Sequence, residues 1–92
     1  MEILHTDDGK HGKFYVEVNG KQEAEMTYVW AGTDKIIIDH TEVSDVLKGQ
    51  SVGKQLVMKA VALAREKHFK ILPLCPFAAS VFEKDATIKD VL

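Results

Sequence analysis

The sequence is poor in cysteine and proline, and it carries no strong excess of charge of either sign. Its 92 residues include one cysteine, Cys75, and two prolines, and the formal net charge is −2. A lone cysteine cannot form an internal disulfide, which is typical of a protein from a reducing compartment. A pI near 6.0 also gives no support to nucleic-acid binding, which favours a basic surface.

Long apolar runs are absent as well. No stretch approaches the roughly 20 apolar residues of a transmembrane helix, and the first residues lack the basic and apolar segments of a secretory signal. We therefore expect a cytoplasmic protein with no membrane partner. Hydrophobic residues make up 46% and charged residues 28%, as in an ordinary globular protein. The length fits one domain over residues 1–92.

Three segments in the first half predict an antiparallel meander. Phe14–Val18 and Lys21–Trp30 alternate apolar and polar residues, and Asn19-Gly20 between them is a strong hairpin signal. The third strand would be Lys35–Val43. Its run of isoleucines would fill both faces, which favours a central position in the sheet.

The polar residues 5–13, with two glycines, predict a loop before these strands. His5 and His11 lie in this segment and raise the question of a metal site. Because there is no second spaced pair of ligands, we expect a solvated loop and no metal.

The second half predicts a helix, a strand and a second helix. Apolar residues recur at three- and four-residue steps between Ser51 and His68, which is the pattern of an amphipathic helix. Phe69–Leu74 is a short strand in which Pro73 removes a backbone donor, so one side of it is unpaired or at an edge. Pro76–Lys84 predicts a helix that begins at a proline, and a short tail follows.

This order of elements predicts an α+β fold. Its mixed sheet would contain the three-stranded antiparallel meander and a parallel fourth strand. A right-handed crossover helix would connect the third strand to the fourth. A C-terminal helix would complete the fold.

A small-residue loop joins the third strand to the first helix. Its sequence is Lys48-Gly49-Gln50-Ser51-Val52-Gly53-Lys54. The start of a helix leaves N–H groups unpaired and carries a partial positive charge, so a phosphate can bind there. The glycines allow close backbone approach and the lysines add positive charge. The alternative is a plain strand-to-helix loop with Ser51 as the helix cap.

Polar residues also end the third strand. By alternation, His40 and Glu42 share one face of the strand, and Thr41 and Val43 share the other. Polar side chains at the end of a central strand are candidates for a site. Alternatively, the strand simply leaves the core there and meets water.

Residues 43–56 resemble the acetyl-coenzyme A loop of the GNAT N-acetyltransferases. In that family a valine ends the central strand, and the pattern Arg/Gln-x-x-Gly-x-Gly/Ala opens the next helix. Val43 and Gly53 match this pattern, whereas Lys48 and Ser51 depart from it.

A wider pattern is similar to a small, truncated group of GNAT-like proteins. The resemblance covers roughly residues 14–85 and implies the GNAT fold. The pattern combines the loop with two motifs, His40-Thr41-x-Val43 and Pro73-x-Cys75-x-Phe77.

The resemblance implies acetyl-coenzyme A as the cofactor. Backbone N–H groups of the loop would bind its pyrophosphate, and its pantetheine arm would lie between the third and fourth strands. The N–H of Val43 would polarise the thioester carbonyl. The implied cofactor-binding residues are Val43, Lys48, Gly49, Gln50, Ser51, Val52, Gly53, Lys54, Ser80 and Lys84.

The resemblance also suggests catalytic residues. Many GNAT enzymes protonate the leaving thiolate with a tyrosine on the last helix, but Phe82 stands near that place here. Cys75 could serve as this acid or as a nucleophile that takes the acetyl group, unless it is only a small buried residue. His40 and Glu42 are the candidate bases for an acceptor amine. Of the two, imidazole suits this role better near neutral pH.

The function predicted is that of an acetyl-coenzyme A-dependent N-acetyltransferase with an unidentified amine acceptor. The helices and later strands that wall the acceptor site in full-length GNAT domains are missing, and an open acceptor side suits a protein or peptide amine. The same openness suits a coenzyme A or acyl-coenzyme A binding module with little or no turnover. A third reading is an interaction domain in which the glycine loop is only structural.

Overall fold

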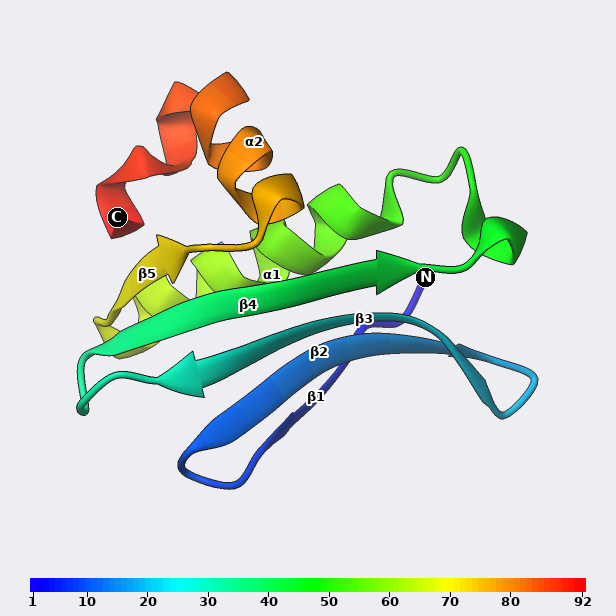
Figure 1. The fold of residues 1–92 in the computed structure, drawn as a ribbon, viewed down its shortest axis with the longest axis horizontal. Helices are drawn as coiled ribbons and strands as arrows, with labels where there is room; N and C mark the ends of the chain where they lie inside the picture. The colour runs from blue at the N-terminus through cyan, green and yellow to red at the C-terminus, as the bar shows by residue number, and fades with distance from the viewer.

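A five-stranded sheet with the order β1-β2-β3-β4-β5 forms one layer of the molecule (Figure 1). The computed structural model describes all residues 1–92. The strands are β1 Leu4–Asp7, β2 His11–Val18, β3 Lys21–Trp30, β4 Lys35–Val43 and β5 Lys70–Pro73. The helices are α1 Val52–Lys67 and α2 Pro76–Lys84, with short 3-10 segments η1 Asp45–Leu47 and η2 Ala86–Val91.

The sheet is mixed, as the sequence predicts. β1 to β4 pair in antiparallel fashion, and β5 pairs in parallel with β4 after the crossover helix α1. The hairpin between β2 and β3 turns at Asn19 and Gly20, whose φ angles of 53° and 79° are both positive. β5 is an edge strand, which agrees with the missing donor of Pro73.

The strand β1 corrects the prediction of a loop over residues 5–13. Its His5 ring stacks on Phe14 with the ring centroids 4.3 Å apart. The Nε2 atom of His5 also shares a hydrogen bond of 2.7 Å with the hydroxyl of Tyr28. His5 is therefore part of the folded structure, and the antiparallel meander has four strands instead of three. His11 is exposed at the start of β2.

The hydrophobic core lies between one face of the sheet and the two helices. α1 packs on β2 to β5, while α2 packs on α1, β4 and β5. In β4, Ile36 and Ile38 are fully buried in this core, but Ile37 is only half-buried on the opposite face. The isoleucine run therefore marks an internal strand, as predicted, although only one of its faces is covered.

None of the helices combines the length and the apolar composition that crossing a bilayer requires.

Candidate functional site

The strands β4 and β5 separate part-way along their length. They are paired only as far as Ile38 and Pro73. Beyond this point the carbonyl oxygen of Ile38 accepts hydrogen bonds from the N–H groups of both Leu74 and Cys75, each at 3.0 Å. β4 then continues to Val43 while the other chain turns into α2, so a gap opens between them (Figure 1).

The N–H of Val43 points into this gap. The next residue, Ser44, donates its N–H to the carbonyl oxygen of Glu23 beside β4, at 2.7 Å. Successive N–H groups of a strand point to opposite edges. The N–H of Val43 therefore points to the edge from which β5 has departed, where it is available to a ligand.

Cys75 and Thr41 meet across the gap. The thiol of Cys75 donates a hydrogen bond to the hydroxyl of Thr41 at 3.3 Å. The sulfur also accepts a hydrogen bond of 3.4 Å from the N–H of Ala78 in the first turn of α2. Cys75 is buried, with 6% of its surface exposed. Thr41 was not among the predicted site residues. The alternation along β4 places it on the same face as Val43, and this could have identified it.

His40 and Glu42 lie on the face of β4 that points away from the helices. Their side chains are 55% and 74% exposed, and Nε2 of His40 is 3.3 Å from Oε2 of Glu42. Glu25 of β3 lies opposite Glu42, and polar atoms of these three side chains all fall within 4.8 Å of one another. The two candidate bases and Cys75 are therefore on opposite faces of the sheet, with the gap between them.

A hollow of about 450 Å³ connects the gap to the N-terminus of α1. It is lined by Thr41, Val43, Leu47, Lys48, Gly49, Ser51, Val52, Gly53, Lys54 and Phe77. Most of the cofactor-binding residues that the family resemblance implies thus share one cavity, whereas Gln50, Ser80 and Lys84 do not line it.

The N-terminus of α1 is open towards this hollow. Ser51 adopts a left-handed conformation with φ of 55° and makes no side-chain capping bond, which corrects the alternative of a serine-capped loop. Gln55 donates its N–H to the carbonyl oxygen of Ser51 at 3.0 Å and so begins the helical ladder. The N–H groups of Val52, Gly53 and Lys54 have no partner within the helix.

The two glycines of the loop have different roles. Gly49 has a φ of 84°, and a Cβ atom added there would meet no atom within 4 Å, so glycine serves the backbone conformation. A Cβ atom on Gly53 would lie 2.6 Å from the ring of Phe77. Gly53 therefore allows the first turn of α1 to contact α2, rather than only admitting a ligand.

Comparison with known proteins identifies the family. The family model for the GCN5-related N-acetyl-transferase matches residues 13–91. The chain belongs to the GCN5-related N-acetyltransferase (GNAT) family. A GCN5-like protein from Staphylococcus aureus, solved by NMR, is 41% identical with a TM-score of 0.77, and the match covers 98% of this chain and 85% of that one. This agreement confirms the short GNAT-like fold that the sequence suggests.

Other GNAT proteins are less similar. Protein NATD1 of Xenopus tropicalis is 30% identical over 69 residues, so the match covers 74% of this chain and 63% of that relative. The ribosomal-protein-S18-alanine N-acetyltransferase of Escherichia coli is 14% identical with a TM-score of 0.67, over 85% of this chain and 53% of the enzyme. An acetyltransferase structure with acetyl-CoA from Clostridium acetobutylicum is 15% identical with a TM-score of 0.67, over 84% and 57% of the two chains. The last two show the fold alone.

The second helix of this GNAT chain carries three residues that the resemblance singles out. The hydroxyl of Ser80 donates to the carbonyl oxygen of Phe77 within α2, at 2.7 Å. Lys84 is exposed in the last turn. Phe82 is 2% exposed and belongs to the core, so no proton donor stands at its position.

A second polar cluster of the GNAT chain lies at the opposite end of the sheet. The hydroxyl of Tyr28 and Nε1 of Trp30 both donate to Oδ2 of Asp7, at 2.6 and 2.9 Å. Burial and the bond to Asp7 raise the pKa of Tyr28. Burial also lowers the pKa of His5. Desolvation opposes ionisation of Asp7, but hydrogen bonds from Tyr28, Gly9 and Trp30 outweigh it and lower its pKa. The cluster attaches β1 to the core.

Proposed function

We propose that this chain is an acetyl-coenzyme A-dependent N-acetyltransferase that acts on an amine, with residues 1–92 as a minimal GNAT domain. The observation that supports this best is the gap between β4 and β5, which opens into the hollow at the start of α1. The lone, buried thiol of Cys75 is compatible with work in a reducing cytoplasm.

The hollow fits an anionic cofactor. Lys48 and Lys54 flank an uncapped helix N-terminus whose N–H groups can bind a pyrophosphate. The wall includes apolar Val43, Leu47 and Phe77, which suit the less polar arm of coenzyme A. Bound acetyl-coenzyme A would supply the activated acetyl group. Contacts from Gln50, Ser80 and Lys84, which lie outside the hollow, stay predictions of the family resemblance.

The two proton transfers would take place on opposite faces of β4. His40 or Glu42 would accept the proton of the acceptor ammonium, so the amine would approach the gap from the uncovered face of the sheet. The N–H of Val43 would donate a hydrogen bond to the oxygen that gains negative charge in the gap.

Cys75 would act on the helix side of the gap. Its thiol proton, now donated to Thr41, could pass to the leaving thiolate. Alternatively, its sulfur could take the acetyl group as the acetyl–sulfur bond of the cofactor breaks, with the thiol proton passing to the departing thiolate. The amine would then take the acetyl group from Cys75 and leave a free thiol. The N–H of Ala78 and the N-terminus of α2 would stabilise negative charge on the sulfur in either case.

A binding module with little turnover is the second candidate function. The observation that favours it is the burial of Phe82 in the core, because the proton donor of many GNAT enzymes is missing from that position. Both functions need the cofactor, so binding and turnover must be measured separately.

Binding is tested by titrating acetyl-coenzyme A into ¹⁵N-labelled protein. We expect the amide signals of Val43 and of residues 50–54 to shift, and absence of these shifts would contradict cofactor binding. The charge reversal Lys48→Glu should weaken binding about tenfold, or 1.4 kcal/mol. The matched control is Lys59→Glu on the exposed side of α1, outside the hollow, which should bind normally.

Turnover is tested by mass spectrometry after incubation with acetyl-coenzyme A and a panel of amines and lysine peptides. Transfer to an amine supports the enzyme, and cofactor binding without any transfer supports the binding module. A gain of one acetyl group on the protein that disappears in Cys75→Ser would support the nucleophile. Undiminished amine transfer in that variant would exclude an essential cysteine.

A further inference from the structure

The face of the sheet opposite the helices carries no covering layer. In β3 the residues on the helix side are buried, whereas those between them are partly exposed. The buried set is Ala24, Met26 and Tyr28, and the partly exposed set is Glu25, Thr27 and Val29. We call the uncovered side the bare face, formed by His11, Lys13, Tyr15, Glu23, Glu25, Thr27, Val29, Lys35, Ile37, Asp39, His40, Glu42 and Leu72.

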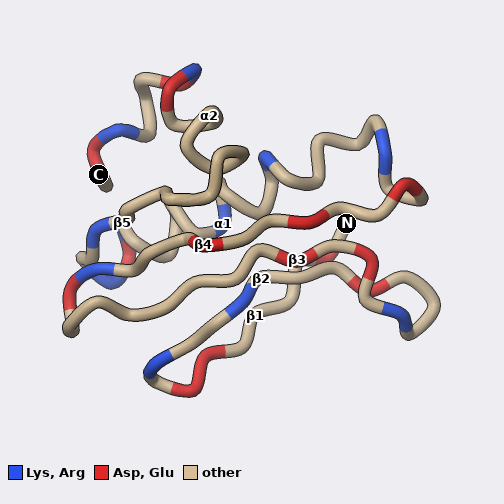
Figure 2. Tube along the Cα trace, viewed as in Figure 1, with Lys and Arg blue, Asp and Glu red and all other residues tan.

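Carboxylates gather on the bare face towards the end of β4. Glu25 and Glu42 converge with His40 to within 4.8 Å. A register shift after Thr27 makes Asp39 an extra residue of β4, and its Oδ1 accepts a hydrogen bond of 2.6 Å from the Thr27 hydroxyl. Figure 2 shows the acidic stretches of β3 and β4 running beside each other.

Little positive charge balances these carboxylates. Lys13 donates to the side chain of Gln22 at 2.6 Å and lies 4.6 Å above the ring of Tyr15. Lys21 pairs with Glu23 at the margin, at 3.8 Å. Lys35 lies on the same face at the other end of β4. None of these lysines forms an ion pair with Glu25, Asp39 or Glu42, so this part of the face presents net negative charge.

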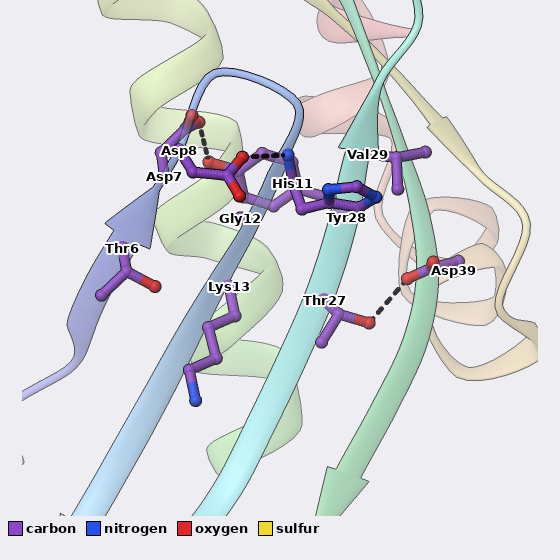
Figure 3. A pocket seen from close by; sticks show the side chains of 10 residues that line it. All are labelled: Thr6, Asp7, Asp8, His11, Gly12, Lys13, Thr27, Tyr28, Val29 and Asp39. Carbon is purple, nitrogen blue, oxygen red and sulfur yellow. Dashed lines mark hydrogen bonds between the residues drawn. The ribbon is translucent and has the colours of Figure 1, made fainter.

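Two hollows lie on the bare face. One of about 420 Å³ lies between the β1–β2 turn and β4, and Figure 3 shows Lys13, Thr27 and Asp39 projecting from neighbouring strands around it. The other, of about 320 Å³, is lined by Lys21, Gln22, Glu23, Ala24, Glu25, Glu42 and Ser44. It lies at the end of β4, where the strand borders the gap.

An apolar row crosses the same face. Val29, Ile37 and Leu72 are neighbours on β3, β4 and β5. Leu72 is 40% exposed, which is high for a leucine in a strand. A partner that covers this face must therefore offer aliphatic side chains as well as positive charge.

We propose that the bare face binds an extended, lysine-rich peptide segment of a partner protein and directs one lysine towards the gap. Five residue steps separate Ile37 from Glu42 on β4, or about 17 Å, which an extended peptide of about five residues spans. A second copy of this chain fits less well because it would bring carboxylates against carboxylates. The role of that lysine as the acetyl acceptor rests on the proposed function, whereas the binding does not.

The binding is measured without acetyl-coenzyme A, by fluorescence anisotropy of a labelled octapeptide of alternating lysine and leucine. We expect saturable binding that weakens about tenfold in Asp39→Lys and in Glu25→Lys, because each reverses a charge on the face. The matched control is Glu66→Lys, an exposed change on α1, which should bind as the unchanged protein does. Equal weakening in the control would show non-specific attraction and overturn the proposal.

Two further measurements keep the result interpretable. Leu72→Ser should lower the affinity for the peptide several-fold without a change in charge. Full retention of affinity would show that the apolar row is not part of the peptide-binding surface. If spermidine displaces the peptide with equal affinity, the face recognises small polycations and the peptide proposal fails. The amide shifts caused by acetyl-coenzyme A are recorded on the same variants. Asp39→Lys should leave these shifts unchanged, so loss of peptide binding can be distinguished from loss of cofactor binding, which would contradict the proposed function.

Discussion

The thiol of Cys75 donates a hydrogen bond to the hydroxyl of Thr41, at 3.3 Å, across the gap between β4 and β5. These residues are 34 positions apart in the sequence. They meet because β5 ends at Pro73 and the chain turns directly into α2. The bond thus fixes a proton-bearing sulfur beside the part of β4 that ends at Val43.

Thr41→Val should lower acetyl transfer about tenfold while the affinity for acetyl-coenzyme A changes less than twofold, because the thiol loses the acceptor that orients it. Single-turnover acetylation and a cofactor titration check the two parts. Thr41→Ser is the control, since it keeps the hydroxyl and should retain most of the rate. Equal losses in both variants would contradict the orienting role.

Gly53→Asp should abolish detectable binding of acetyl-coenzyme A. It places a carboxylate at the open N-terminus of α1, where it repels a pyrophosphate, and its Cβ would lie 2.6 Å from the ring of Phe77. Calorimetry measures the affinity. Gly53→Ala has the same Cβ without the charge, so it should shift the half-exposed Phe77 ring and weaken binding only a few-fold. Identical effects of the two variants would exclude the electrostatic cause.

Gly12→Ala should destabilise the fold by about 1–3 kcal/mol, as overpacking does. A Cβ atom there would lie 2.3 Å from the ring of Tyr28, which is 1% exposed and held by Asp7. Urea denaturation gives the free energy of unfolding. Lys13→Ala, the next residue on the exposed side of β2, should cost less than about 1 kcal/mol. A normal stability of Gly12→Ala would show that the ring can move aside.

Stability should fall as the pH decreases from about 6.5, the ordinary pKa of histidine. Burial lowers the pKa of His5 in the folded state, so the unfolded chain binds its proton more readily and acid favours unfolding. The lowered pKa of Asp7 extends the loss below about pH 4. Thermal melts across this range should show a smaller slope between pH 6.5 and 5 in His5→Gln. An unchanged slope would assign the effect to other groups.

The sequence predicts the elements whose pattern is local. The bounds of β3 and β4 follow from alternation and from the hairpin signal, and α2 begins at its proline. β1 escapes prediction because Leu4 is its only apolar residue and the polar residues His5, Thr6 and Asp7 follow it, so no alternation marks a strand. It is held by antiparallel pairing with β2 and by hydrogen bonds that Asp7 accepts from Tyr28 and Trp30, more than 20 positions away.

The candidate site likewise has parts that could be predicted from local sequence and parts that could not. The glycine loop is recognisable from its composition and Val43 from the family resemblance, so the cavity at the start of α1 could be anticipated. The bond between Thr41 and Cys75 could not, because it depends on where two strands part. The left-handed conformation of Ser51 is also invisible in the sequence, since serine is a common helix cap and here leaves the N-terminus open.

The carbonyl oxygen of Ile38 accepts both the Leu74 and Cys75 N–H groups, and this makes it the hinge of the gap. Beyond it no backbone ladder ties α2 to β4, and β5 is a short edge strand, so local opening there needs only a few bonds to break. The amide protons of Leu74 and Cys75 should therefore exchange with solvent faster than those in the centre of β3. A ligand that fills the gap would slow this exchange and so couple cofactor occupancy to the mobility of α2.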